Sequence, residues 1–73
     1  MWDKNWNPKL SIGDIWHECR YSRDRGYRKV IGFTSREGFP CYDYVKCNKS
    51  GKEFKTRSNV ICEHVDKDLN HGK

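Results

Sequence analysis

Two short motifs of histidine and cysteine have residue types that bind metal ions. His17-x-Cys19 and Cys62-x-His64 form a mirrored pair, and residues two apart on an extended strand point to the same face. If the two strands were neighbours, the four side chains could converge as a tetrahedral zinc site, which would stabilise a short chain. The spacing lacks the usual Cys-x2-Cys knuckle, and buried Cys and His are ordinary core residues. We therefore expect no cofactor, with zinc as the alternative.

Basic residues gather in two segments of a chain with 15 Lys and Arg against 10 Asp and Glu, a net charge of +5. The first segment contains Arg20, Arg23, Arg25, Arg28 and Lys29. The second contains Lys46, Lys49, Lys52, Lys55 and Arg57. Clustered positive charge is typical of phosphate contact, and nearby tyrosines could stack on unpaired bases. The pattern predicts contact with nucleic acid or an acidic protein surface; the alternative is that these charges are simply solvated.

Two tryptophans stand in the polar N-terminal segment. Trp2 and Trp6 are four residues apart, with Lys4 between them, so one helical turn would place both rings on one face. Such rings could anchor in the groove of a protein partner. Alternatively, they fold back over the open end of a small domain whose core is thin.

The remaining patterns exclude several classes of protein. The chain has no paired carboxylates in a motif, no nucleophile elbow and no phosphate-binding glycine loop, so we expect no enzyme activity. It also has no apolar signal region and no stretch of about 20 apolar residues that could span a bilayer. We expect a cytoplasmic protein with reduced cysteines.

Short β-branched and aromatic runs must position these groups. We expect five strands, at residues 15–21, 29–34, 39–47, 53–57 and 60–65, with a bulge at Gly32 and a turn at residues 48–51. In the first strand, alternation places His17 and Cys19 on the inner face and Trp16 and Glu18 on the other. Helix content should be minimal, because no segment has sustained helical periodicity.

The run Leu10-Ser11-Ile12-Gly13-Asp14-Ile15, followed by a polar loop, a hairpin and a short last strand, resembles the pattern of an SH3-like barrel. The resemblance covers residues 10–65 and implies an all-β fold, a small five-stranded SH3-like barrel or a twisted antiparallel sheet. We expect flexible tails at residues 1–9 and 66–73.

In size, charge and tail tryptophans, the chain is also similar to small phage-encoded transcription regulators of the Xanthomonas-phage type. That similarity implies a monomeric, non-enzymatic protein that binds host RNA polymerase, inhibiting initiation, causing antitermination, or both. Trp2, Lys4 and Trp6 would then contact the polymerase, and the basic segments would lie near nucleic acid or an acidic protein face. The alternatives are direct binding of RNA or single-stranded nucleic acid, and a structural module stabilised by zinc.

Overall fold

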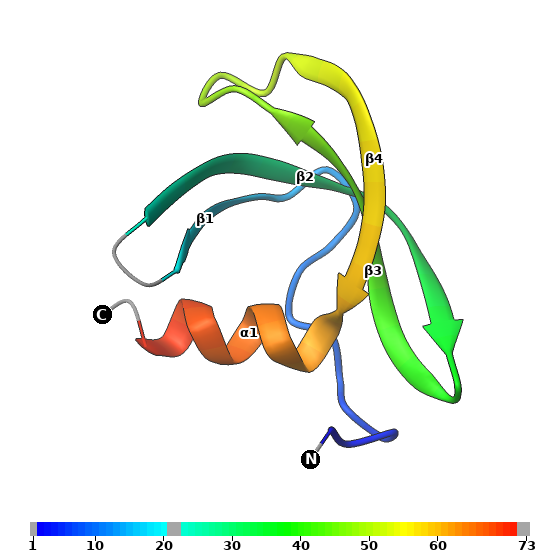
Figure 1. The fold of residues 1–73 in the computed structure, drawn as a ribbon. Coiled ribbons are helices and arrows are strands. Elements are labelled where there is room, and N and C mark those ends of the chain that lie inside the picture. Colours follow the sequence, from blue (N-terminus) through cyan, green and yellow to red (C-terminus); the bar gives the residue numbers. More distant parts are fainter. Residues whose placement is uncertain (1, 21–22, 72–73) are drawn as a thin grey trace.

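The chain folds into one antiparallel sheet and one helix in a computed structural model that describes residues 2–20 and 23–71. The elements are β1 (Ile15–Arg20), β2 (Arg23–Arg36), β3 (Phe39–Cys47), β4 (Glu53–Ile61) and α1 (Cys62–His71). Each strand pairs with its neighbour in the chain, in the order β1-β2-β3-β4. The sheet curls over one side of α1 (Figure 1). The expected antiparallel β fold is therefore confirmed, since the described residues form an open sheet of four strands. The described residues do not show the expected five-stranded barrel.

Helix α1 replaces the expected fifth strand. β4 ends at Ile61, and the residues from Cys62 onward are helical, including much of the expected C-terminal tail. Cys62 and Val65 are fully buried one turn apart, and Leu69 packs beside them. Lys67 forms an ion pair of 2.6 Å with Glu63, four residues earlier. The negative charge in the first turn also favours the helix, because that end carries partial positive charge.

Tight turns fix the register of the β2–β3 and β3–β4 strand pairs. Glu37 and Gly38 both have positive φ, as a two-residue hairpin turn of the favoured handedness requires. In the next turn, the side-chain oxygen of Asn48 accepts backbone hydrogen bonds from Ser50 and Lys52. The predicted turn at residues 48–51 is thus confirmed. The predicted bulge at Gly32 is confirmed as well, since the β2–β3 register shifts between Val30 and Gly32.

The core lies between α1 and the face of the sheet that it covers. Its buried members are Trp16, Val30, Tyr42, Cys62 and Val65. Trp16 and Glu18 are buried, whereas His17 and Cys19 are exposed. The expected facing of the first strand is therefore wrong. Trp16 has the largest apolar surface in this strand, and its burial places Glu18 on the same inner face.

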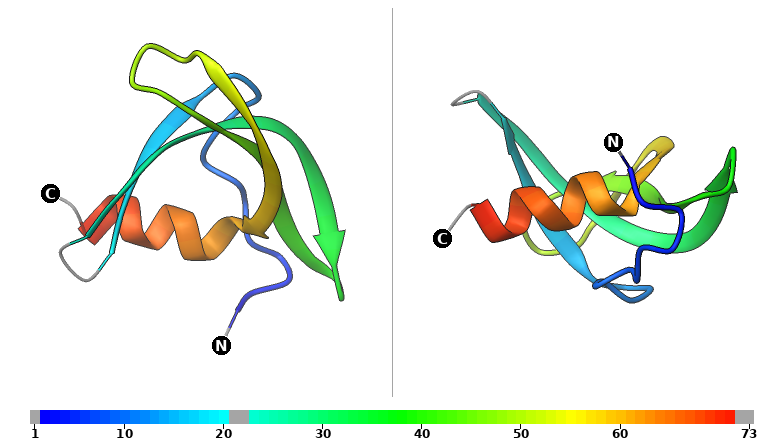
Figure 2. Two further views of the ribbon diagram at one scale, coloured as in Figure 1. Left: turned by 45° about the horizontal axis from the view of Figure 1, so that its top comes forward. Right: turned by 90° about the horizontal axis from the view of Figure 1, so that it is seen from below.

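The N-terminal segment, expected as a flexible tail, runs across the start of α1 (Figure 2). The indole nitrogen of Trp6 donates a hydrogen bond of 2.7 Å to Asp66. The backbone N–H of Asp3 donates one of 2.5 Å to Glu63. These contacts hold the beginning of the chain against its last element. No helix in the described ranges has the length and apolar character needed to cross a membrane.

Candidate nucleic-acid interface

Arg28 stands at the centre of a row of side chains that crosses three strands. It pairs in register with Trp16 on β1 and with Lys46 on β3. Directly opposite residues of antiparallel strands place their side chains on the same face, so this row lies on the helix-facing side of the sheet. The sheet therefore brings members of both predicted basic segments, Arg28 and Lys46, onto one surface.

The guanidinium group of Arg28 is buried against an aromatic ring and a carboxylate. Only 9% of the residue is exposed, and its Cζ lies 5.2 Å from the centre of the Tyr44 ring. Its Nη1 lies 3.4 Å from Oε1 of Glu18, and the same oxygen accepts a 3.0 Å hydrogen bond from the indole of Trp16. The cation–π contact with Tyr44 and the ion pair with Glu18 together hold the guanidinium in place.

One donor of this buried group lacks a partner. Among the residues that the structure describes, no hydrogen-bond acceptor lies within reach of the Nε–H of Arg28. A buried donor without an acceptor costs about 1–3 kcal/mol, and such groups in proteins are few. The hydrogen bonding of Arg28 is therefore incomplete within the described protein.

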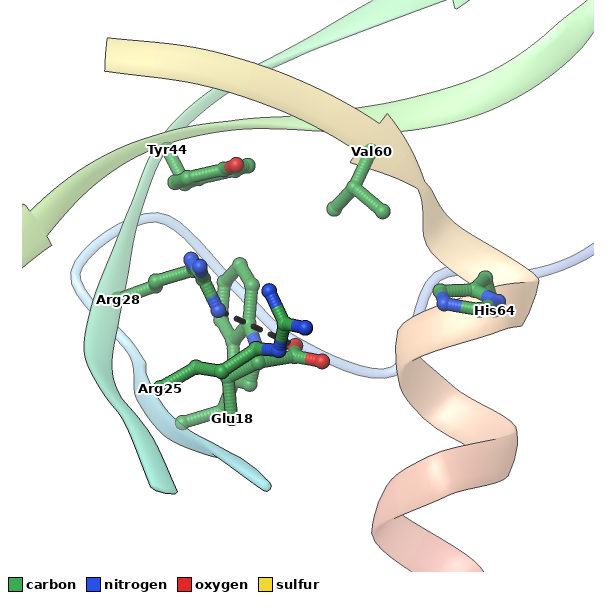
Figure 3. Close-up of a pocket in the computed structure, with 7 residues that line it drawn as sticks. Glu18, Arg25, Arg28, Tyr44, Val60 and His64 are labelled. Carbon is green, nitrogen blue, oxygen red and sulfur yellow. Dashed lines mark hydrogen bonds and ion pairs between the residues drawn. The ribbon is translucent and has the colours of Figure 1, made fainter. Parts of the chain in front are cut away.

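A cavity of about 290 Å³ opens beside Arg28. Its lining residues are Trp16, Glu18, Arg25, Arg28, Tyr44, Val60 and His64. Figure 3 shows Arg25 and Arg28 of β2 and Tyr44 of β3 at one part of the cavity, with Val60 of β4 and His64 of α1 across from the arginines. Among the described residues, the lining thus combines two arginines with aromatic surface and one acidic residue. This composition favours a planar or anionic ligand over a cation.

The other predicted basic residues whose side chains the structure describes lie outside this cavity. The Nζ of Lys29 donates 2.9 Å to the Gly51 carbonyl and pairs with Glu53 at 3.2 Å, so this lysine is committed to the β3–β4 turn. Arg23 is exposed at the start of β2, and the side chain of Arg20 lies outside the described residues. The exposed basic residues of the β3–β4 hairpin are Lys49, Lys52, Lys55 and Arg57. The hairpin turn is at the end of β4 away from α1 (Figure 1).

The structure does not bring Trp2, Lys4 and Trp6 together as one anchor. Trp6 is tied to Asp66, and the ring of Trp2 meets His64 edge-on at 5.4 Å. The ammonium group of Lys4 lies 5.3 Å from the centre of the Phe39 ring. Each of these three side chains therefore has its own contact within the fold. For the two tryptophans, this agrees with the alternative that they fold back over the domain.

The predicted set of four metal ligands does not converge. Cys62 is fully buried, and burial raises the pKa of its thiol to about 12, whereas Cys19 and His17 are exposed on β1. In the described part of the chain, the group whose donor atoms lie within 4.8 Å of one another is His17, Cys19 and Asp24. A backbone hydrogen bond from Gly26 and a bond from His17 lower the pKa of Asp24.

The sequence did not identify Trp16 and Glu18 as site residues, nor Asp24 as a neighbour of Cys19. The β1–β2 register places Trp16 opposite Arg28 and Cys19 opposite Asp24. A hairpin joining residues 15–20 directly to residues 23–29 would have predicted these neighbours, but the expected strands leave residues 22–28 as a loop.

Comparison with known proteins gives no relative. No family model matches this chain, and neither the curated proteins nor the solved structures contain a significant match.

Proposed function

We propose that this protein is a non-enzymatic module that binds single-stranded nucleic acid, with one nucleotide unit held in the cavity beside Arg28. The observation that carries the proposal is the buried Arg28 guanidinium, which makes a cation–π contact with Tyr44 and is incompletely hydrogen-bonded, with Arg25 beside it. Arginine binds phosphate oxygens in a planar fork and also stacks on bases.

The size of the cavity supports the binding of one nucleotide unit. At about 290 Å³ it lies at the lower limit of small-ligand pockets, which begin near 300 Å³. It suits one phosphate or one unstacked base and not a longer segment. The rest of a strand would then lie on exposed surface, where Lys46 continues the row of Arg28.

Helix α1 favours single-stranded over double-stranded ligands. Its described side chains include the acidic Glu63, Asp66 and Asp68 against one lysine, Lys67. A helix with this charge would be repelled by the phosphates that line a major groove. The bases of a single strand, in contrast, are free to stack on protein side chains.

Fluorescence anisotropy with a labelled oligouridine, measured over a series of salt concentrations, tests the proposal. We expect affinity to fall as salt rises, with a slope of log K against log salt of about −0.7 per phosphate contact. R25A should weaken binding roughly fivefold, about 1 kcal/mol, and reduce the slope by about 0.7. R28K keeps the charge but loses the planar fork, and it should also weaken binding.

R36A is the matched control, because Arg36 is an exposed arginine at the opposite end of the same strand. Its effect should be well below that of R25A. Equal losses in R25A and R36A, or binding that does not respond to salt, would count against the cavity. Binding to RNA polymerase with no affinity for oligouridine would favour the regulator hypothesis, which stays a prediction. Trp2, 37% exposed, is more available for such a contact than the half-buried Trp6.

A further inference from the structure

A second group of polar side chains lies on the hairpin of β1 and β2, outside the cavity of Arg28. The Nε2 of His17 lies 2.8 Å from Oδ1 of Asp24 and 3.4 Å from the sulfur of Cys19. Both contacts involve Nε2, and the sulfur of Cys19 also lies 3.6 Å from Nδ1 of the same ring. The group therefore offers nitrogen, sulfur and oxygen donor atoms close to one another.

The backbone of the hairpin fixes these positions. Cys19 and Asp24 are opposite each other in the β1–β2 register, and the register shifts between His17 and Cys19. The His17 ring stacks on the Tyr27 ring at 4.4 Å with an angle of 16° between their planes. The backbone N–H of Gly26 donates a 2.7 Å hydrogen bond to Oδ1 of Asp24. The imidazole and the carboxylate are thus each held by a group that is not itself a metal ligand.

The sulfur–nitrogen distance in this group matches the demands of a small tetrahedral ion, and the nitrogen–oxygen distance of 2.8 Å is shorter. Zinc bonds of about 2.0–2.3 Å at tetrahedral angles place neighbouring donor atoms ~3.3–3.6 Å apart. The sulfur–nitrogen distance is already 3.4 Å, and all three donor atoms lie within 4.8 Å of one another. Rotation of exposed side chains is enough to close the remaining differences, because His17 and Asp24 are 39% and 69% exposed.

We propose that His17, Cys19 and Asp24 form a three-ligand site for a divalent metal of the zinc class. This site shares only His17 and Cys19 with the set expected from the sequence, and it does not depend on the proposed nucleic-acid function. Three protein ligands leave the fourth position of a tetrahedral ion to water or to a ligand from outside the chain.

The charges and protons of the proposed site balance. On binding, the thiol of Cys19 releases its proton to solvent, the sulfur–metal bond forms, and neutral His17 binds through Nε2. One thiolate and one carboxylate offset the two positive charges of the ion. The occupied site is therefore neutral and adds no net charge to the flanking Arg23 and Arg25.

Titration of the reduced, metal-free protein with Co²⁺ is the test, since a thiolate ligand gives a sulfur-to-cobalt charge-transfer band. We expect an equimolar endpoint, with the band displaced by Zn²⁺. Loss of a group that merely supports a ligand costs about 10–100-fold in affinity, so loss of a ligand in C19S or H17Q should cost on the order of 100-fold or more. D24N should weaken binding as well.

H64Q is the matched control, since it removes the other histidine of the expected set and should leave the band unchanged. NMR of the ring nitrogens in the unmodified protein gives a readout without substitution, and Nε2 of His17 should shift on addition of Zn²⁺. A band that survives C19S, a band lost in H64Q, or uptake without an endpoint, which is adventitious binding only, would each overturn the site.

Discussion

The phenol of Tyr42 donates a 2.8 Å hydrogen bond to Oδ1 of Asp66 and so connects the middle of the sheet to helix α1. The same phenolic oxygen accepts hydrogen bonds of 2.9 Å from the backbone N–H groups of Lys9 and Leu10. The other carboxylate oxygen of Asp66 accepts the indole bond of Trp6. Three parts of the chain, the N-terminal segment, β3 and α1, therefore meet at one buried polar pair.

Removal of the Tyr42 hydroxyl should destabilise the fold. In Y42F, two backbone N–H groups lose an acceptor and Asp66 loses a donor, so we expect the free energy of unfolding to fall by about 1–3 kcal/mol in urea denaturation. Y27F is the control. Tyr27 contacts His17 through its ring face, which phenylalanine retains, so its effect should stay within about 0.5 kcal/mol. Equal effects of the two substitutions would contradict the importance of the Tyr42–Asp66 pair.

Stability should decrease in alkaline solution. Burial raises the pKa of Tyr42 above its ordinary value of 10.0 and raises the pKa of Cys62 from 9.0 to about 12. At high pH the unfolded chain therefore binds fewer protons than the folded chain, and stability is complete below the ordinary pKa values and is lost above them. Thermal melts should show a falling Tm above about pH 9, and Y42F should lessen the fall. A Tm that stays level up to about pH 11 would refute this expectation.

The indole of Trp6 should contribute to stability through its N–H group. W6F keeps an aromatic ring but leaves the Asp66 carboxylate without this donor, and we expect a loss of about 1–2 kcal/mol. In a domain of this size, each kcal/mol corresponds to a Tm shift of roughly 4–8 °C. W2F serves as the control, because phenylalanine can keep the edge contact that Trp2 makes with His64. If both variants melted at the same temperature, Trp6 would have no special role.

Glu18 should affect stability and ligand affinity in opposite directions. E18Q removes the negative charge that compensates buried Arg28, so we expect stability to fall by up to about 3 kcal/mol. The cavity becomes more positive at the same time, and affinity for oligouridine should rise severalfold at low salt. E37Q makes the same change in net charge on the exposed β2–β3 turn. Similar gains in E18Q and E37Q would indicate a general charge effect.

Strand β3 and the turn after it could be predicted from the sequence because their signals are local. The alternating run at residues 39–47 and the turn chemistry around Asn48 and Gly51 depend on neighbouring residues alone. The helix was missed because its polar composition concealed the spacing of Cys62, Val65 and Leu69, which places these residues on one helical face. Its stability comes from packing on the sheet, and the sequence of one segment does not show that packing.

The site could be predicted only in part for a related reason. Arginine clustering identified Arg25 and Arg28 as candidates for anion contact, and both line the cavity. The burial of Glu18 depends on its pairing with Arg28, ten residues later, and on the indole of Trp16. Alternation alone could not decide which face of β1 is buried, because each face carries both apolar and polar residues.

The hydrogen bond between Trp6 and Asp66 joins positions 60 residues apart, and this separation bears on the order of events during synthesis. Each hairpin of the sheet joins neighbouring segments and can form early, since short loops close at low entropic cost. The segment with Trp6 is synthesised well before its partner Asp66 in α1. The growing chain therefore exposes the indole of Trp6 until α1 has emerged, and for that interval Trp6 is accessible to chaperones as it is not in the finished fold.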